Sequence, residues 1–277
     1  MRNWFKWLVP VGLIGYTYYP TFVWMVDRWS AKDSYFGHGF LIPLVTLFWL
    51  LQKREKLLAI ERQSDGWGIV AILAAGVLQV AASLLRVYFV SAISFVMLII
   101  GSVWYAFGRK ALREAWFPVA FLFLMVPLPL LMISEVTLKM KFFVSEISVF
   151  LLNRSGINAS RLGSYIQMPH AVILIGDPCS GLRSFLAFLC LGIVFAYSEK
   201  LALSQKGLLV LIGLPLAILS NVVRVFSLAF LSEIYGEKTI TGRIHDVSGY
   251  IVFILAFLVF MAIRKKMENA SHEVKAI

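Results

Sequence analysis

The sequence predicts an all-α membrane protein, built as a bundle of about eight transmembrane helices. Two features support this prediction. Of the 277 residues, 60% are hydrophobic and only 15% are charged, whereas soluble domains carry about 25% charged residues. Apolar stretches of about 20 residues, the length that a helix needs to cross the hydrocarbon layer, recur along the chain. Because no internal repeat or low-complexity linker divides them, we expect residues 1–277 to form a single integral membrane domain.

The expected spans follow one another through the chain. The first comes after Arg2 and Lys6 and lacks a small-residue cleavage site, so we interpret it as a retained helix rather than a signal peptide. Arg86 alone separates the third span from the fourth. Pro127 and Pro129 fall within the fifth and are expected to bend it. The eight predicted helices cover residues 7–26, 38–52, 66–85, 87–108, 115–134, 180–198, 207–231 and 247–263.

Basic residues indicate the orientation of the chain in the membrane. The net charge is +11, but the Lys and Arg residues are scattered over loops rather than gathered on one face, which argues against nucleic acid as a partner. With the N-terminus in the cytoplasm, more than half of them lie in cytoplasmic segments close to helix ends, as the positive-inside rule requires. Both termini are therefore predicted to be cytoplasmic, and Cys179 to lie on the outer side.

The long connection at 135–179 is expected to contain two elements. Residues 135–154 alternate apolar and charged side chains at near-helical spacing, which predicts an amphipathic helix on the outer membrane surface. Residues 164–176 contain two β-prone runs around Pro169, which predict a small β-hairpin just before Cys179. The charged residues of the expected amphipathic helix are Lys139, Lys141 and Glu146.

Cys179 is the strongest candidate for a reactive group. It follows Pro178 at the expected start of a helix, where free N–H groups and the helix dipole stabilise a thiolate. The alternative is a small buried packing residue, the role that suits Cys190. We expect both thiols to be free, because 11 positions along one helix separate them by roughly 16 Å, too far for a disulfide.

Two arginines and an asparagine could serve this thiol. Arg224 lies inside an apolar run, where an ionisable residue usually faces a cavity or a partner, although a snorkelling arginine is the alternative. Asn221 lies on the same helical face and could hold the guanidinium or a substrate amide. Arg183 follows Cys179 by four residues on the expected helix, so it could lower the pKa of the thiol or anchor the helix among the headgroups.

The remaining candidates are polar residues expected on the outer side. His245 could act as a base and then as an acid toward a leaving amine, or be an ordinary loop histidine. The other supporting candidates are Ser180, Asp177, Asp246 and His38, the last in a glycine-rich turn at 33–43 expected to line the same vestibule. The four histidines have no metal-ligand spacing, so we expect neither a metal nor a cofactor.

An ordered set of motifs covers nearly the whole chain. The motifs are Tyr35-Phe36-Gly37-His38-Gly39-Phe40-Leu41-Ile42-Pro43, Phe117-Pro118 with Val126-Pro127-Leu128-Pro129, Cys179-Ser180-Gly181-Leu182-Arg183-Ser184, Asn221-Val222-Val223-Arg224, and His245 with Gly249. In type and order this set resembles the exosortases and archaeosortases.

The resemblance implies a multi-pass cysteine transpeptidase of the bacterial inner membrane. Its partners would be exported proteins with a C-terminal sorting signal, namely a Pro-Glu-Pro-type motif, a transmembrane helix and a basic cluster, together with membrane lipid and a glycan or lipid-linked acceptor. By motif, Cys179 resembles the nucleophile, Arg224 the essential arginine and His245 the third member of the site. If water replaces the acceptor, the enzyme is a hydrolase.

Two other functions remain open from the residues alone. A transporter or scaffold subunit of a surface-polysaccharide (exopolysaccharide) export system would explain the bundle, the prolines and the intramembrane arginines. It would not explain Cys179 at a helix start. A membrane acyltransferase that uses Cys179 or His245 on a lipid substrate is the second alternative.

Overall fold

The computed structural model describes residues 5–32, 34–236 and 243–276, with side chains at all of these positions except 5–8, 178, 243, 245, 246 and 272–276. This part of the chain is mostly helical and contains one small sheet. The helices that are long and apolar enough to cross a membrane cover Gly66–Leu85, Tyr88–Met125, Leu203–Tyr235 and Val247–Ser271, and shorter apolar helices cover Gly37–Gln52 and Leu182–Ser198. The chain is therefore a helical, multi-pass membrane protein, while the number of eight spans stays a prediction.

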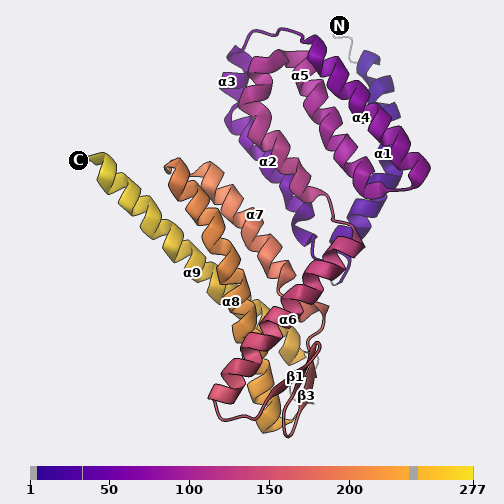
Figure 1. Ribbon diagram of the computed structural model, residues 1–277. Helices are drawn as coiled ribbons and strands as arrows, with labels where there is room; N and C mark the ends of the chain where they lie inside the picture. The colour runs from indigo at the N-terminus through magenta and orange to yellow at the C-terminus, as the bar shows by residue number, and fades with distance from the viewer. Residues whose placement is uncertain (1–4, 33, 237–242, 277) are drawn as a thin grey trace. The chain divides into compact units, whose positions relative to one another are not determined.

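The chain forms two compact units, Met1–Pro129 and Leu130–Ile277, which are described in turn. In the first unit, α4 and α5 run side by side (Figure 1) and make the most extensive helix packing. The elements of this unit are α1 (Phe5–Ser30), η1 (Gly37–Phe40), α2 (Leu41–Gln52), α3 (Arg54–Ala59), α4 (Gly66–Leu85), α5 (Tyr88–Phe121) and η2 (Leu122–Met125).

A network of neutral polar side chains is buried between α1, α4 and α5. Gln79 lies at its centre, because its Oε1 accepts from the hydroxyls of Ser91 at 2.6 Å and Ser94 at 3.0 Å. Each serine hydroxyl is also hydrogen-bonded to α1, Ser91 to Thr21 and Ser94 to Tyr18. Buried polar groups cost free energy unless they are paired, and here the pairs join three helices.

The second unit combines four helices with a three-stranded antiparallel sheet in the order β1-β2-β3. Helix α8 is its centre, because α6, α7 and α9 all pack against it. The strands follow α6 and lead directly into a 3-10 turn that contains Cys179. The elements are α6 (Leu130–Arg154), β1 (Ser160–Leu162), β2 (Tyr165–Gln167), β3 (Val172–Leu174), η3 (Asp177–Cys179), α7 (Leu182–Ser198), α8 (Leu203–Tyr235) and α9 (Arg243–Ala276).

The sheet confirms the hairpin predicted around Pro169. Strands β2 and β3 pair antiparallel with Ile166 opposite Ile173, and β1 adds a third strand that the sequence pattern did not predict. Glu233 of α8 holds the hairpin turn, since its two carboxylate oxygens accept from the backbone N–H of His170 at 3.0 and 3.2 Å. The His170 ring Nδ1 lies 2.7 Å from the same carboxylate.

The predicted fifth helix, 115–134, is wrong as one continuous helix. The chain leaves the helical conformation after Met125, and Val126 is extended at φ −76° and ψ 116°. A proline disfavours helical geometry at the residue before it and supplies no N–H, so Pro127 and Pro129 end the helix rather than bend it. A new helix, α6, then begins at Leu130 and includes the amphipathic segment expected at 135–154.

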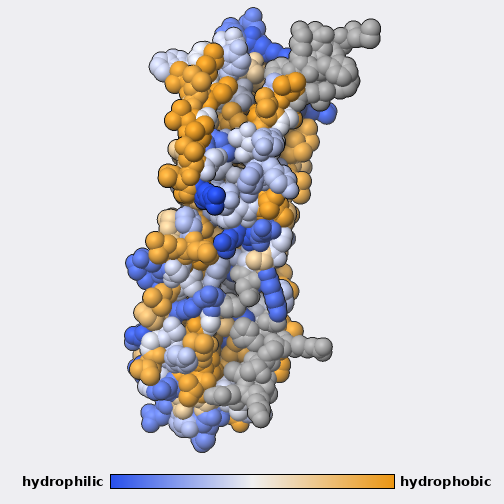
Figure 2. All heavy atoms as spheres, turned by 90° about the vertical axis from the view of Figure 1, so that its right-hand side faces the viewer, coloured by the Kyte–Doolittle hydropathy of each residue, from blue (hydrophilic) through white to orange (hydrophobic). Residues whose placement is uncertain are grey.

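Much of the surface of both units is apolar. Figure 2 shows hydrophobic side chains over much of one face, interrupted by hydrophilic ones. In the first unit, Leu73 and Val77 of α4 are 64% and 72% exposed, and in the second unit Leu211 of α8 is 63% exposed. Exposed apolar surface on this scale does not suit a protein surrounded by water, but it suits helices that face lipid.

Candidate functional site

Three consecutive residues, Cys179, Ser180 and Gly181, shape the turn that carries the thiol. The Cys179 N–H donates to the Gly176 carbonyl at 3.0 Å and so closes the 3-10 turn. Ser180 is fully buried, and its hydroxyl accepts from the N–H of Leu182 at 3.3 Å. Gly181 then adopts a left-handed conformation, φ +83°, before α7 begins at Leu182. Cys179 therefore lies at the end of a 3-10 turn that precedes α7.

This geometry corrects the expectation that Cys179 and Arg183 share one helix. The left-handed conformation of Gly181 interrupts the helical path between them, so the four-residue spacing does not place both side chains on one face. Arg183 is exposed in the first turn of α7. Its proposed effect on the thiol stays a prediction, as does its role as a headgroup anchor.

Asn221 of α8 clamps the Cys179 turn. Its Nδ2 donates to the backbone carbonyl of Cys179 at 2.7 Å, and the asparagine is 4% exposed. The close approach depends on Gly181, where an added Cβ would lie 2.9 Å from Asn221 Cγ. The predicted partner of Asn221 was a guanidinium or a substrate amide, whereas here the amide fixes the backbone that carries the thiol.

The thiol of Cys179 lies in an apolar environment with positive charge nearby. Cys179 is 6% exposed and belongs to a buried cluster with Ile166, Ile175, Val222 and Val225. Burial raises the pKa of its thiol above the ordinary value, and the positive charges of Arg224 and then Lys141 act in the opposite direction. The arginine expected from the sequence to serve this thiol is therefore placed to favour the thiolate.

Arg224 extends from α8 to the beginning of α9. Its Nε donates to the hydroxyl of Ser248 at 3.4 Å, and a Cβ added to Gly249 would lie 3.0 Å from the guanidinium carbon. The absence of a side chain at Gly249 thus leaves room for the guanidinium. His245 precedes Gly249 by four residues, about one turn of the same helix. The side chains of His245 and Asp246 lie outside the described residues, so their roles stay predictions.

Lys141 is a functional candidate that the sequence reasoning missed. It was assigned only to the charged face of an amphipathic helix, yet its Nζ lies 2.5 Å from Oδ1 of Asp177. The side chain of Lys141 is 16% exposed and that of Asp177 is 65% exposed. Asp177 begins the 3-10 turn that ends at Cys179, so this ion pair ties α6 to the turn. Sequence spacing gives no signal for this pair, because 36 positions separate the two residues.

Two further residues considered from the sequence are Cys190 and His38. Cys190 is a buried free thiol within α7. His38 lies in η1, which belongs to the first unit, and its place in a vestibule with Cys179 stays a prediction.

A comparison with known protein families identifies the family of the chain. The model of a family described as transmembrane exosortase matches residues 29–262, which is most of the chain. The chain belongs to the transmembrane exosortase family. The matched range of this exosortase includes Cys179, Arg224 and His245. No curated protein and no solved structure matches the chain.

Proposed function

We propose that this exosortase is a membrane cysteine transpeptidase that cleaves the C-terminal sorting signal of exported proteins. The nucleophile is the Cys179 thiol, Arg224 stabilises negative charge, and His245 transfers protons. One observation carries the proposal: the thiol of the family motif lies on a turn that Asn221 clamps, with the charge of Arg224 acting on it. A packing cysteine requires neither the clamp nor the cation.

The first chemical step forms an acyl-enzyme. His245 takes the proton of the Cys179 thiol, the thiolate attacks the scissile carbonyl carbon to form a carbon–sulfur bond, and the carbonyl oxygen becomes an oxyanion. Arg224 stabilises this oxyanion, an effect that is worth about 3–4 kcal/mol for one donor in a site that excludes water. The carbon–nitrogen bond then breaks, and His245 gives its proton to the departing amine, which leaves a thioester on Cys179.

The second step returns the enzyme to its starting state. An incoming nucleophile, an amine or a glycan or lipid-linked acceptor, gives its proton to His245 and attacks the thioester carbonyl. The carbon–sulfur bond breaks, and the Cys179 thiolate that leaves regains its proton from His245. If the nucleophile is water, the product is a free carboxylic acid and the reaction is hydrolysis.

The proposal includes a position in the cell. The enzyme lies in the bacterial inner membrane as a single exosortase-like domain of about eight spans, with both termini in the cytoplasm and the thiol on the periplasmic side. Its substrates carry a Pro-Glu-Pro-type motif, a transmembrane helix and a basic cluster. Figure 2 supports lateral approach of such a helix, because much of the surface that it shows is apolar.

The decisive experiment measures processing of a tail-bearing reporter in cells that express the wild type, Cys179→Ala or Cys190→Ala. We expect Cys179→Ala to abolish the mobility shift of the reporter, because no acyl-enzyme can form. Cys190→Ala is the matched control, since it removes the other buried thiol from α7. If Cys179→Ala still processes the reporter, the nucleophile is wrong, and a role as a transporter or scaffold subunit becomes the better explanation.

A further inference from the structure

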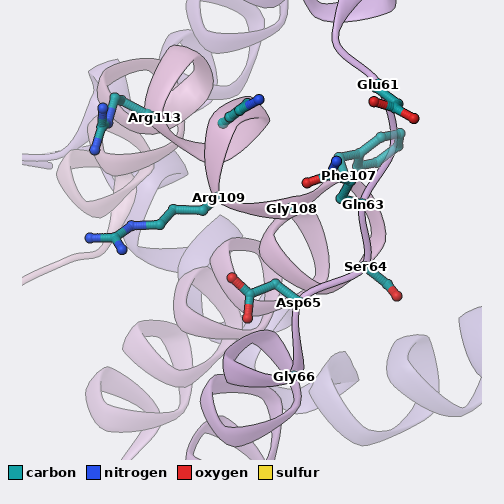
Figure 3. A pocket seen from close by; sticks show the side chains of 10 residues that line it. Glu61, Gln63, Ser64, Asp65, Gly66, Phe107, Gly108, Arg109 and Arg113 are labelled. Carbon is teal, nitrogen blue, oxygen red and sulfur yellow. The ribbon is translucent and has the colours of Figure 1, made fainter.

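A second polar site lies in the first unit, at the end of the α4–α5 pair where α4 begins. It is a pocket of about 580 Å³ between the loop at 61–65 and the helical turns that follow Gly108 (Figure 3). Three cations line it, Arg109, Lys110 and Arg113, together with Glu61 and Asp65. Neither the proposed reaction nor the family motifs use any of these residues.

The pocket is held in shape by contacts within the protein. Asp65 caps α4, because its Oδ1 accepts from the backbone N–H of Trp67 at 3.0 Å, while its Oδ2 accepts from the Trp104 indole at 2.8 Å. Gly108 interrupts α5 at φ +81° and ψ 176°, and a Cβ added there would lie 2.2 Å from the Gln63 carbonyl oxygen. Only glycine fits this contact, so the loop and the helix break form one wall.

The three cations of the pocket have no ion-pair or hydrogen-bond partner for their side chains among the residues that the structure describes. Both carboxylate oxygens of Asp65 are already used. Figure 3 shows the guanidinium groups of Arg109 and Arg113 on one side of the pocket, and Glu61 on the other. The arginine side is therefore available to an anion.

The position of the pocket matches the boundary between hydrocarbon and headgroups. Helix α4 has 20 residues, which corresponds to about 30 Å, the thickness of the hydrocarbon core, and the pocket lies at its first turn. Trp67 and Tyr105 are 67% and 44% exposed at this end, and aromatic residues of this kind favour the interface. Leu73 and Val77, farther along α4, are more than half exposed and face where acyl chains would lie.

We propose that this pocket binds the phosphodiester of an anionic phospholipid headgroup. Arg109 and Arg113 hold the phosphate oxygens, since a guanidinium presents paired donors that match phosphate geometry. The apolar flank of α4 favours a lipid over a free phosphate compound. The sequence predicts that this end of α4 faces the cytoplasm, where the negative surface potential attracts such basic segments.

The test measures lipid affinity of the purified full-length protein in detergent by native mass spectrometry. The ligands are phosphatidylglycerol, phosphatidylcholine and inorganic phosphate. The site variant is Arg109→Gln with Arg113→Gln. The control, Lys139→Gln with Arg154→Gln, removes the same charge from α6. One charge-assisted hydrogen bond to phosphate contributes about tenfold in affinity, so we expect the site variant to bind phosphatidylglycerol roughly 100-fold more weakly and the control to bind it like the wild type.

Three results would overturn the proposal. Equal loss in both double variants would show an effect of net charge alone. Wild-type affinity in the site variant would exclude these arginines as ligands. Inorganic phosphate that competes with phosphatidylglycerol at similar concentration would assign the pocket to a soluble phosphate compound. A loss of affinity in the site variant must be separated from a loss of folding, so Arg109→Lys is measured together with the two double variants. We expect Arg109→Lys to keep the thermal unfolding midpoint of the wild type while its affinity for phosphatidylglycerol falls.

Discussion

The two units bury polar groups in different ways. In the first unit, the buried network is neutral: Gln79 accepts from two serine hydroxyls, and each serine is hydrogen-bonded to a hydroxyl of α1. In the second unit, Cys179 lies in an apolar cluster, with its backbone held by Asn221 and its thiol under the influence of two cations. A paired neutral network stabilises a fold, whereas at Cys179 the charges of Arg224 and Lys141 oppose the rise in thiol pKa that burial causes. We therefore expect mutations in the Gln79 network to lower stability, and mutations around Cys179 to lower processing of the reporter.

After Cys179→Ala, the largest effect is expected from Arg224→Gln. Loss of the guanidinium removes both the stabilisation of the oxyanion and the charge that favours the Cys179 thiolate, so processing of the reporter should fall by about 10²–10³-fold. The thermal unfolding midpoint should change little, because glutamine keeps most of the side-chain stem. Arg154→Gln serves as the control on α6 and should process normally. Processing by Arg224→Gln at the wild-type rate would remove Arg224 from the mechanism.

Asn221→Ala should affect both properties. It leaves the Cys179 carbonyl without its donor in a buried site, which costs about 1–3 kcal/mol of stability, and it releases the turn, so we also expect processing to fall by about tenfold. Thermal unfolding and reporter cleavage are measured on the same samples. Normal cleavage by a destabilised Asn221→Ala protein would show that the clamp serves the fold alone.

Gln79→Leu is the complementary change in the first unit. It removes the acceptor shared by Ser91 and Ser94, so we expect a loss of about 1–3 kcal/mol in stability. Cleavage per folded molecule should be unchanged, since the network contains no group that the proposed reaction uses. A loss of cleavage without a loss of stability would contradict the contrast between the units.

The smallest effect is expected from Lys141→Gln. Burial raises the pKa of Cys179, and Lys141 lowers it, so loss of this charge should raise the pKa further. Less thiolate is then present at a given pH, and the rate of Cys179 alkylation should shift toward higher pH in a Cys190→Ala background. The shift should be smaller than with Arg224→Gln, whose charge acts more strongly on the thiol. Lys139→Gln, on the same helix, should leave the profile unchanged.

The sequence predicted the features that depend on local patterns. The expected helix at 66–85 has the same bounds as α4, and the hairpin formed around Pro169 as the β-prone runs indicated. The expected boundary at 108 coincides with the break at Gly108. The length of an apolar run and the positions of turn residues are sufficient to predict such features, because each feature depends on residues that are close together in the sequence.

Most of the features that could not be predicted depend on contacts between residues far apart in the sequence. The contact between Lys141 and Asp177, and that between His170 and Glu233, join elements whose spacing gives no periodic signal. The placement of Cys179 on a single helix failed for a local reason, because the left-handed Gly181 was not recognised. Asn221 was selected correctly, but its partner is the backbone of the thiol turn, which only the packing of α8 could reveal.

The contacts that hold the turn at Cys179 form late in synthesis, because they come from a helix farther along the chain. Asn221 is made 42 residues after Cys179, and Glu233 is made 63 residues after His170. At ribosomal rates of about 5–20 residues per second, the second interval lasts roughly 3–13 s. During that time the hairpin and the turn are present without the helix that fixes them. The turn that carries Cys179 is therefore completed only after α8 has left the ribosome, and a nascent chain that stalls before this helix carries the cysteine without the Asn221 hydrogen bond.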